Sequence, residues 1–157
     1  LIKEDPNSRR IMMTTFNPSQ LKESVLAPCH SLILQFYVEN KNLSCHMYQR
    51  SADLFLGVPF NISSTTLLLY IIANATNLKP KDVIISFGDV HIYESHLEQC
   101  NIQINRLPYK FPKIKILKEQ NKSDIDSILE YIESLEYKDF KLSEYKFYDR
   151  IKANMVA

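Results

Sequence analysis

A strand, a turn and a second strand in the first third of the chain constrain its fold more than any other feature. Leu32 to Val38 is a run of mainly apolar and aromatic residues, and Leu43 to Gln49 alternates apolar with polar residues. The Glu39-Asn40-Lys41-Asn42 segment between them has the composition of a turn. Alternation along a strand places Cys45 and Met47 on one face. The pattern predicts an antiparallel hairpin with one buried face, in which Cys45 is a core residue.

Further helices and strands are expected after the hairpin. Ser63 or Ser64 is a candidate cap for a helix that runs to about Asn77, before Lys79-Pro80. Thr65 to Ala75 is apolar nearly all round, which is typical of a helix buried inside a domain. The other expected elements are strands over 83–87 and 113–117, a helix over 94–105, an extended segment over 106–112, and a helix from Ser123 that Ser123 and Asp126 would cap.

Length and composition limit the class of protein. The 157 residues are 45% hydrophobic and include nine Tyr and eight Phe, enough for the core of one domain. The formal net charge of +1 provides no general field for nucleic acid or anionic membranes. The longest apolar run, Leu67 to Ala75, is about half of what a bilayer span needs, and no signal peptide is recognisable. We therefore expect a soluble, cytoplasmic domain of mixed helices and strands, with neither DNA nor membrane as a partner.

The three cysteines differ in their surroundings. Cys29, Cys45 and Cys100 have no metal-ligand spacing, and their odd number fits a reducing compartment better than secretion. We expect no metal site. A lone cysteine is more often a small buried residue than a nucleophile. Cys29 nevertheless lies between Pro28 and His30, directly before the first strand of the hairpin, which makes it a candidate nucleophile.

Three further segments gather polar and charged side chains. Tyr48 to Asp53 reads Tyr-Gln-Arg-Ser-Ala-Asp and is followed by Asn61. Gly88 to Tyr93 reads Gly-Asp-Val-His-Ile-Tyr, and Arg9-Arg10 precedes Asn17-Pro18. Adjacent arginines are usually a solvated surface, but guanidinium groups also bind phosphate oxygens through paired hydrogen bonds.

In order and in near spacing, Cys29 and these segments resemble the thymidylate synthases. The resemblance implies an α+β fold, with a mixed β-sheet, packed helices and a homodimer formed through the sheet. It begins in mid-fold at Leu1, so we expect residues 1–157 to be the C-terminal portion of a longer domain. Family members are shorter near residues 121–138, which we interpret as an inserted surface helix.

The resemblance also implies a reaction. Cys29 would add to C6 of the uracil ring of dUMP, with Arg50 promoting its thiolate. The co-substrate 5,10-methylenetetrahydrofolate would donate the carbon and the hydride that convert dUMP to dTMP. The folate-binding residues would be Asp53 and Val156. The dUMP-binding residues would be Arg9 and Arg10 of a second subunit together with Cys29, His30, Gln49, Arg50, Ser51, Ala52, Asp53, Asn61, His91, Ile92 and Tyr93.

Asn61 bears on the choice of base. A carboxamide both donates and accepts hydrogen bonds, so it matches O4 and N3–H of uracil, whereas a carboxylate would suit cytosine better. Asn61 therefore favours dUMP over dCMP.

Some positions depart from the family pattern or carry special expectations. One extra residue after Cys29 predicts a β-bulge between Ser31 and Gln35, because a slip by one residue would invert the following side chains. Gly57 is expected to adopt a backbone conformation that other residues resist. The tail would fold over the folate through Met155-Val156-Ala157, but the usual His-Pro pair is replaced around Phe147-Tyr148-Asp149.

Two other functions stay open. A dUMP hydroxymethylase would use the same thiol but let water trap the exocyclic methylene. A degenerate, non-catalytic member would keep only dimerisation or binding, which Thr65 in place of the usual tyrosine and the altered tail would suit. Fusion to an upstream dihydrofolate reductase is a further possibility. Other active-site groups of the family lie in the part expected to be absent, so the 157 residues alone should be inactive or very weakly active.

Overall fold

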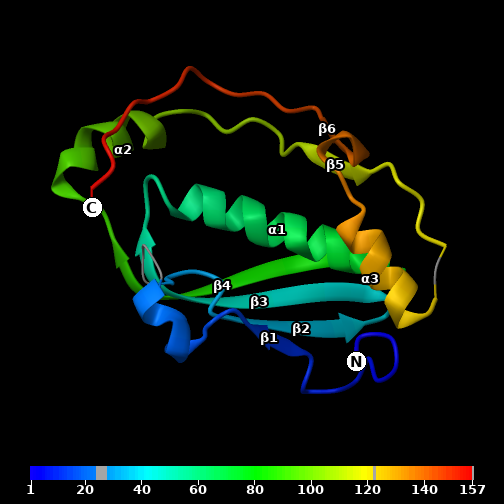
Figure 1. The fold of residues 1–157 in the computed structure, drawn as a ribbon. Helices are drawn as coiled ribbons and strands as arrows, with labels where there is room; N and C mark the ends of the chain where they lie inside the picture. Colours follow the sequence, from blue (N-terminus) through cyan, green and yellow to red (C-terminus); the bar gives the residue numbers. More distant parts are fainter. Residues whose placement is uncertain (24–27, 122, 157) are drawn as a thin grey trace. The chain divides into compact units, whose positions relative to one another are not determined.

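The computed structural model describes residues 1–23, 28–121 and 123–156 (Figure 1). The chain divides into two compact units, Leu1–His91 and Ile92–Ala157. The first unit contains the sheet and the long helix, and the second contains shorter helices and a two-stranded ribbon.

The first unit is built on one four-stranded sheet in the order β1-β2-β3-β4. β1 (Met12–Thr14) and β2 (Ile33–Glu39) are joined through the 3-10 helix η1 (Pro18–Glu23), and β3 (Asn42–Asp53) and β4 (Lys79–His91) complete the sheet. The β1–β2 and β2–β3 pairs are antiparallel, whereas β3 and β4 are parallel. The expected α+β fold with a mixed sheet is confirmed.

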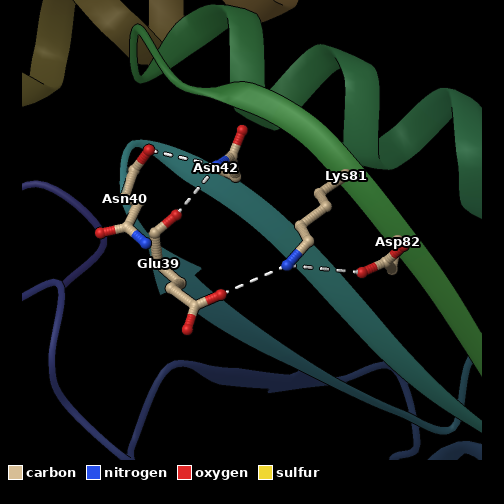
Figure 2. Close-up of polar contacts among 5 residues, drawn as sticks. All are labelled: Glu39, Asn40, Asn42, Lys81 and Asp82. Carbon is tan, nitrogen blue, oxygen red and sulfur yellow. Dashed lines mark hydrogen bonds and ion pairs between the residues drawn. The ribbon is translucent and has the colours of Figure 1, made fainter.

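The β2–β3 hairpin turns through two residues, Asn40 and Lys41, whose φ angles are 48° and 61°. Positive φ at both positions matches the right-handed twist of paired strands. Cys45 and Met47 are 1% and 0% exposed, so the predicted buried face is confirmed. Figure 2 shows that Lys81 of β4 reaches the turn, with its Nζ 3.2 Å from a carboxylate oxygen of Glu39.

The long helix α1 (Val58–Ala75) joins β3 to the parallel strand β4. It begins about six residues before the predicted cap, so the prediction that Ser63 or Ser64 starts it is wrong. Their hydroxyls instead donate back to carbonyls of the preceding turn, as serines inside helices do. Asn77, with φ 58°, takes the left-handed conformation that commonly follows a helix end.

One face of α1 is buried. Asn61, Thr65, Leu69 and Ala73 recur every four residues and are at most 9% exposed. Every residue of the Thr65 to Ala75 stretch is buried or half-buried, in line with the expectation for that part of the helix, whereas Phe60 in the first turn is 76% exposed. By length and composition α1 would also suffice to cross a membrane, a test that core helices of soluble proteins pass as well.

The predicted bulge between Ser31 and Gln35 is wrong, because the β2–β3 ladder is regular from the first residue of β2. The pairs run without a shift in register: Ile33 with Tyr48, Leu34 with Met47 and Gln35 with His46.

The irregularity lies just before the ladder. Arg50 donates its backbone N–H to the carbonyl of Cys29 over 2.9 Å. From Tyr48 to Arg50 is two residues along the chain, whereas from Ile33 back to Cys29 is four. The two extra residues form a bend around Ser31, whose φ is 56°. Two residues, unlike one, leave the alternation of side chains intact.

The second unit begins with the 3-10 helix η2 (Glu94–His96) and α2 (Leu97–Ile104), which together match the predicted helix. β5 (Lys113–Ile116) pairs with β6 (Phe140–Ser143), and α3 (Ile125–Glu133) and the 3-10 helix η3 (Tyr137–Asp139) lie between them in sequence.

The cap predicted for α3 is wrong. Asp124, not Ser123 with Asp126, is the N-cap residue, and its carboxylate accepts the backbone N–H of Ser127 over 2.9 Å. A side chain one position closer to the helix therefore performs the capping that the pattern assigned to Ser123.

Candidate active site

The candidate site lies at the carboxyl ends of the parallel strands β3 and β4, where α1 begins. Ser51 pairs with Asp89, and Asp53 pairs with His91. The chain passes from Asp53 into α1 within five residues. Strand ends of this kind, beside a helix N-terminus, are the usual place for ligands in parallel βαβ units.

Gly88 allows β4 to approach β3 closely at Arg50. A Cβ atom on Gly88 would lie 2.6 Å from the Arg50 carbonyl oxygen and 3.0 Å from the Tyr48 hydroxyl. Gly88 has no positive φ, so the need for glycine comes from the neighbouring backbone and not from its conformation.

The expectation for Gly57 is wrong in a similar way. Its φ of −84° lies in the right-handed helical region that any residue adopts. A Cβ atom there would lie 3.1 Å from the Asp53 carbonyl oxygen, which is a tight contact without a severe clash.

Arg50 holds the segment around Cys29. Its backbone N–H donates to the Cys29 carbonyl over 2.9 Å, and its side-chain Nε donates to the Pro28 carbonyl over 2.7 Å. Cys29 is a free, half-buried thiol, and His30 beside it is exposed. The structure thus brings Cys29 and Arg50 together, although they are 21 positions apart in the sequence.

Gln49 and Asn61 form a buried pair of amides. Gln49 Nε2 donates to Asn61 Oδ1 over 2.9 Å and also to the Ser51 carbonyl over 2.9 Å. Gln49 is 1% exposed and Asn61 is 9% exposed. Because Oδ1 of Asn61 accepts from Gln49, the pair assigns the opposite side of the Asn61 amide to its NH₂ group.

Asp53 shapes the loop that leads into α1. Its Oδ1 accepts the backbone N–H groups of Phe55 over 3.0 Å and of Leu56 over 3.3 Å, and its carbonyl accepts that of Gly57. This is the local turn that aspartate commonly makes. Between Arg50 and Asp53, Ser51 is half-buried and Ala52 is fully buried.

His91 ends β4 beside an acidic partner. Its Nδ1 lies 2.9 Å from Oδ1 of Asp89, two residues earlier on the same face of the strand. Asp89 was not among the predicted site residues, although the spacing of two within the Gly88–Tyr93 segment is the signal that reveals it. Ile92 and Tyr93 open the second unit, where Ile92 is 40% exposed and Tyr93 is half-buried.

Arg9 and Arg10 lie at the other end of the sheet. Met12 of β1 pairs with Gln35, which pairs with His46 of β3. Arg9 and Arg10 precede Met12, so they lie level with the start of β3. At ~3.3 Å per residue, that is roughly 20 Å along the strand from Arg50. Both are exposed, and they line a hollow of about 570 Å³ with residues of the first turn.

Val156 belongs to the C-terminal tail of the second unit and is 40% exposed. The neighbouring Ala157, which the sequence also assigned to the folate contact, lies outside the described residues. Within the described part of the chain, no group of three or more His, Cys, Asp or Glu side chains is arranged to hold a metal ion.

The buried Cys45 differs from Cys29 in its exposure. Desolvation raises the pKa of Cys45 from 9.0 to about 11, so this thiol is protonated and unreactive near neutral pH. Cys29, by contrast, is half-buried, and its carbonyl accepts the backbone N–H of Arg50 at the strand ends.

The chain is also similar in sequence to known proteins. The thymidylate synthase family profile matches residues 1–157. The chain is 45% identical to a thymidylate synthase of Mycoplasma pneumoniae and 46% identical to one of Homo sapiens, in each case over 98% of the chain. It is 47% identical to a bifunctional dihydrofolate reductase-thymidylate synthase of Zea mays, again over 98% of the chain.

The chain spans about half the length of the first two relatives, 50% and 46%, and 28% of the third. The matched region is the whole chain. It therefore includes the hairpin, the Cys29–Arg50 contact and the buried Gln49–Asn61 pair. The chain belongs to the thymidylate synthase family.

Proposed function

We propose that the 157 residues are the C-terminal portion of a thymidylate synthase, which converts dUMP to dTMP with 5,10-methylenetetrahydrofolate. The main support for this proposal is that Cys29, Arg50 and the Gln49–Asn61 pair lie together at one end of the sheet. Family membership over the whole chain supports the same reaction. Residues 121–138, which contain α3, are the proposed surface insertion.

Cys29 is the proposed nucleophile. Its thiolate adds to C6 of uracil, which makes C5 nucleophilic toward the one-carbon unit of the folate. C5 bonds to that carbon and loses its proton, and the bond from the carbon to the folate nitrogen breaks. Hydride from the folate then reduces the exocyclic methylene to a methyl group as the bond between C6 and the Cys29 sulfur breaks, which leaves dTMP, dihydrofolate and the free thiolate. Arg50, which donates to the carbonyls of both Pro28 and Cys29, is the proposed cationic neighbour of this nucleophile.

Asn61 selects uracil. With Oδ1 held by Gln49, the NH₂ group donates to O4, and the second lone pair of Oδ1 accepts from N3–H. The opposed donor pattern of cytosine would leave a buried amide unsatisfied, which costs about 1–3 kcal/mol. Gln49 thus acts through Asn61, and His91 and Tyr93 are proposed to bind the ribose.

A homodimer completes the site in this proposal. In one chain, Arg9 and Arg10 lie at the opposite end of the sheet from Cys29, so they cannot hold the phosphate of a nucleotide bound there. A second copy facing the sheet in the opposite direction would bring its own Arg9 and Arg10 to that end. The open face of the sheet supplies an apolar contact surface, since Ile33, Tyr37 and Ile84 are 44%, 63% and 55% exposed.

The remaining assignments follow the family. Arg50 and Ser51 would hold the phosphate, His30, Ala52 and Ile92 would line the nucleotide, and Asp53 and Val156 would contact the folate. The free thiols suit a cytoplasmic enzyme.

The test uses the complete polypeptide that carries these residues. Incubation with dUMP and methylenetetrahydrofolate should yield dTMP and dihydrofolate, and 5-fluoro-dUMP with the folate should label Cys29 stoichiometrically. Cys29→Ser should abolish both, while Cys100→Ser serves as the matched control. Hydroxymethyl-dUMP as the product would favour the hydroxymethylase, and absence of any adduct would favour a non-catalytic module.

A further inference from the structure

We propose that His96 and Gln99 are positioning residues that hold the C-terminal tail along α2, so that the tail is in place to close over the folate. The inference rests on the proposed function for its consequence, but its structural part concerns this unit alone. No catalytic step is assigned to either side chain.

His96 makes the central contact. It occupies the N-cap position of α2 without a side-chain bond to the helix, is 1% exposed, and its Nε2 lies 2.8 Å from the carbonyl oxygen of Asn154. A carbonyl oxygen only accepts, so Nε2 carries the proton and donates it. Removing a donor from a buried pair leaves the acceptor without its partner, which makes the contact costly to lose.

Gln99 repeats the contact one helical turn later. Its Nε2 lies 3.5 Å from the Lys152 carbonyl oxygen, at the long limit of a hydrogen bond. Positions three apart on a helix share a face, and carbonyls two apart in an extended chain point the same way. The later helix residue contacts the earlier tail residue, so the tail runs antiparallel to α2, as Figure 1 shows beside the C-terminus.

The tail has no regular structure of its own to hold it. Residues 147–156 form neither helix nor strand, and Met155 and Val156 are 84% and 40% exposed. A chain end without such support is usually frayed. The hydrogen bonds from His96 and Gln99 to the tail backbone therefore restrict the position of Val156.

His96 also contacts Tyr93, which is one of the proposed ribose-binding residues. The rings of Tyr93 and His96 meet edge to face, with centroids 5.6 Å apart at an interplanar angle of 80°. Substitutions at position 96 must keep a ring of similar size if the effect on the tail is to be separated from an effect on Tyr93.

The first experiment follows release of the C-terminal residues of the 157-residue chain by carboxypeptidase Y. His96→Phe keeps the ring but loses the N–H, and release should become roughly tenfold faster, the factor that corresponds to loss of one buried hydrogen bond. His96→Gln restores a donor near Nε2 and should restore slow release. An unchanged rate in folded His96→Phe overturns the proposal. Gln99→Met, at a less buried position, decides the matter if His96→Phe does not fold, with a smaller acceleration expected.

Gln103→Met is the matched control, because Gln103 lies one turn beyond Gln99 on α2 and is exposed. It should leave release unchanged. Equal acceleration by Gln103→Met would also overturn the proposal, since the effect would then come from the helix as a whole.

The second experiment measures kinetics of the complete polypeptide. His96→Phe should raise the KM for methylenetetrahydrofolate roughly tenfold, leave dUMP binding unchanged, and be rescued by His96→Gln. A fall in dUMP affinity equal to the rise in KM would overturn the positioning role. If the unaltered polypeptide makes no dTMP, the proposed function fails, and the release rates still decide whether His96 holds the tail.

Discussion

The two ends of the four-stranded sheet are held by different interactions. At the carboxyl ends of β3 and β4, the Gln49–Asn61 amides are buried, and Gly88 lets two backbones meet. At the hairpin end, Lys81 forms ion pairs with Glu39 and Asp82 whose side chains are 46–58% exposed (Figure 2). Buried polar contacts tolerate little change, whereas exposed ion pairs contribute little. Three substitutions test this contrast, and two measurements on Cys45 test the buried core between the two ends.

Gly88→Ala should have the largest effect. The added Cβ would lie 2.6 Å from the backbone of Arg50, which cannot move aside as a side chain can, so the free energy of unfolding should fall by about 3 kcal/mol. Urea denaturation measures it. Gly57→Ala is the matched control, because its Cβ contact is 3.1 Å and its φ is ordinary. A larger loss for Gly57→Ala than for Gly88→Ala would contradict the packing argument.

Cys45 should react slowly with iodoacetamide while the chain is folded. Its pKa is raised from 9.0 to about 11, so at pH 8 its thiolate fraction falls about a hundredfold relative to the unfolded chain. Mass spectrometry of labelled peptides, with and without guanidinium chloride, gives the ratio. Similar labelling rates in both conditions would be incompatible with a buried thiol.

The same raised pKa affects stability at alkaline pH. The unfolded chain loses the Cys45 proton from about pH 9, while the folded chain keeps it until about pH 11, so this group's contribution is complete below pH 9 and is lost as pH rises through 11. The Cys45→Ala variant should therefore lose less stability between pH 8 and pH 10.5 than the unaltered chain.

Gln49→Met should cost about 2 kcal/mol of unfolding free energy, because it removes a buried donor from Asn61 without a large change of volume. Gln35→Met, on the exposed face of β2, is the control and should change stability little. Equal losses for the two variants would show that the buried amide pair is not special.

Lys81→Ala should have the smallest effect, below about 1 kcal/mol, and the loss should shrink further in 1 M salt. Lys79→Ala on the same strand provides the comparison. A salt-independent loss larger than that of Gln49→Met would reverse the contrast between the two ends of the sheet.

Local patterns predicted the hairpin well and the helix starts poorly. Alternation assigned Cys45 and Met47 to the core, because every second residue of a strand faces the same way. The start of α1 was misplaced because two serines in the sequence are good cap residues. In the structure the helix begins earlier, directly after the turn in which Asp53 accepts the backbone N–H groups of Phe55 and Gly57. The bend at Ser31 was misjudged because its size depends on where Cys29 meets Arg50 across the sheet.

The candidate site divides in the same way. The motifs named Cys29, Arg50, Asn61 and His91, but Asp89 as the partner of His91 and Gln49 as the partner of Asn61 emerged from the folded chain. Neither His96 nor Asn154 stood out in the sequence, since a histidine and a carbonyl 58 residues apart share no local pattern.

By itself, the sequence determined the class of fold, the buried face of the hairpin and the family, because these follow from local periodicity and from motifs read in order. Only the tertiary structure decided which way the Asn61 amide faces, why position 88 must lack a side chain, and what anchors the tail. Those features depend on atoms brought together from distant parts of the chain, and their positions are set by packing and strand pairing.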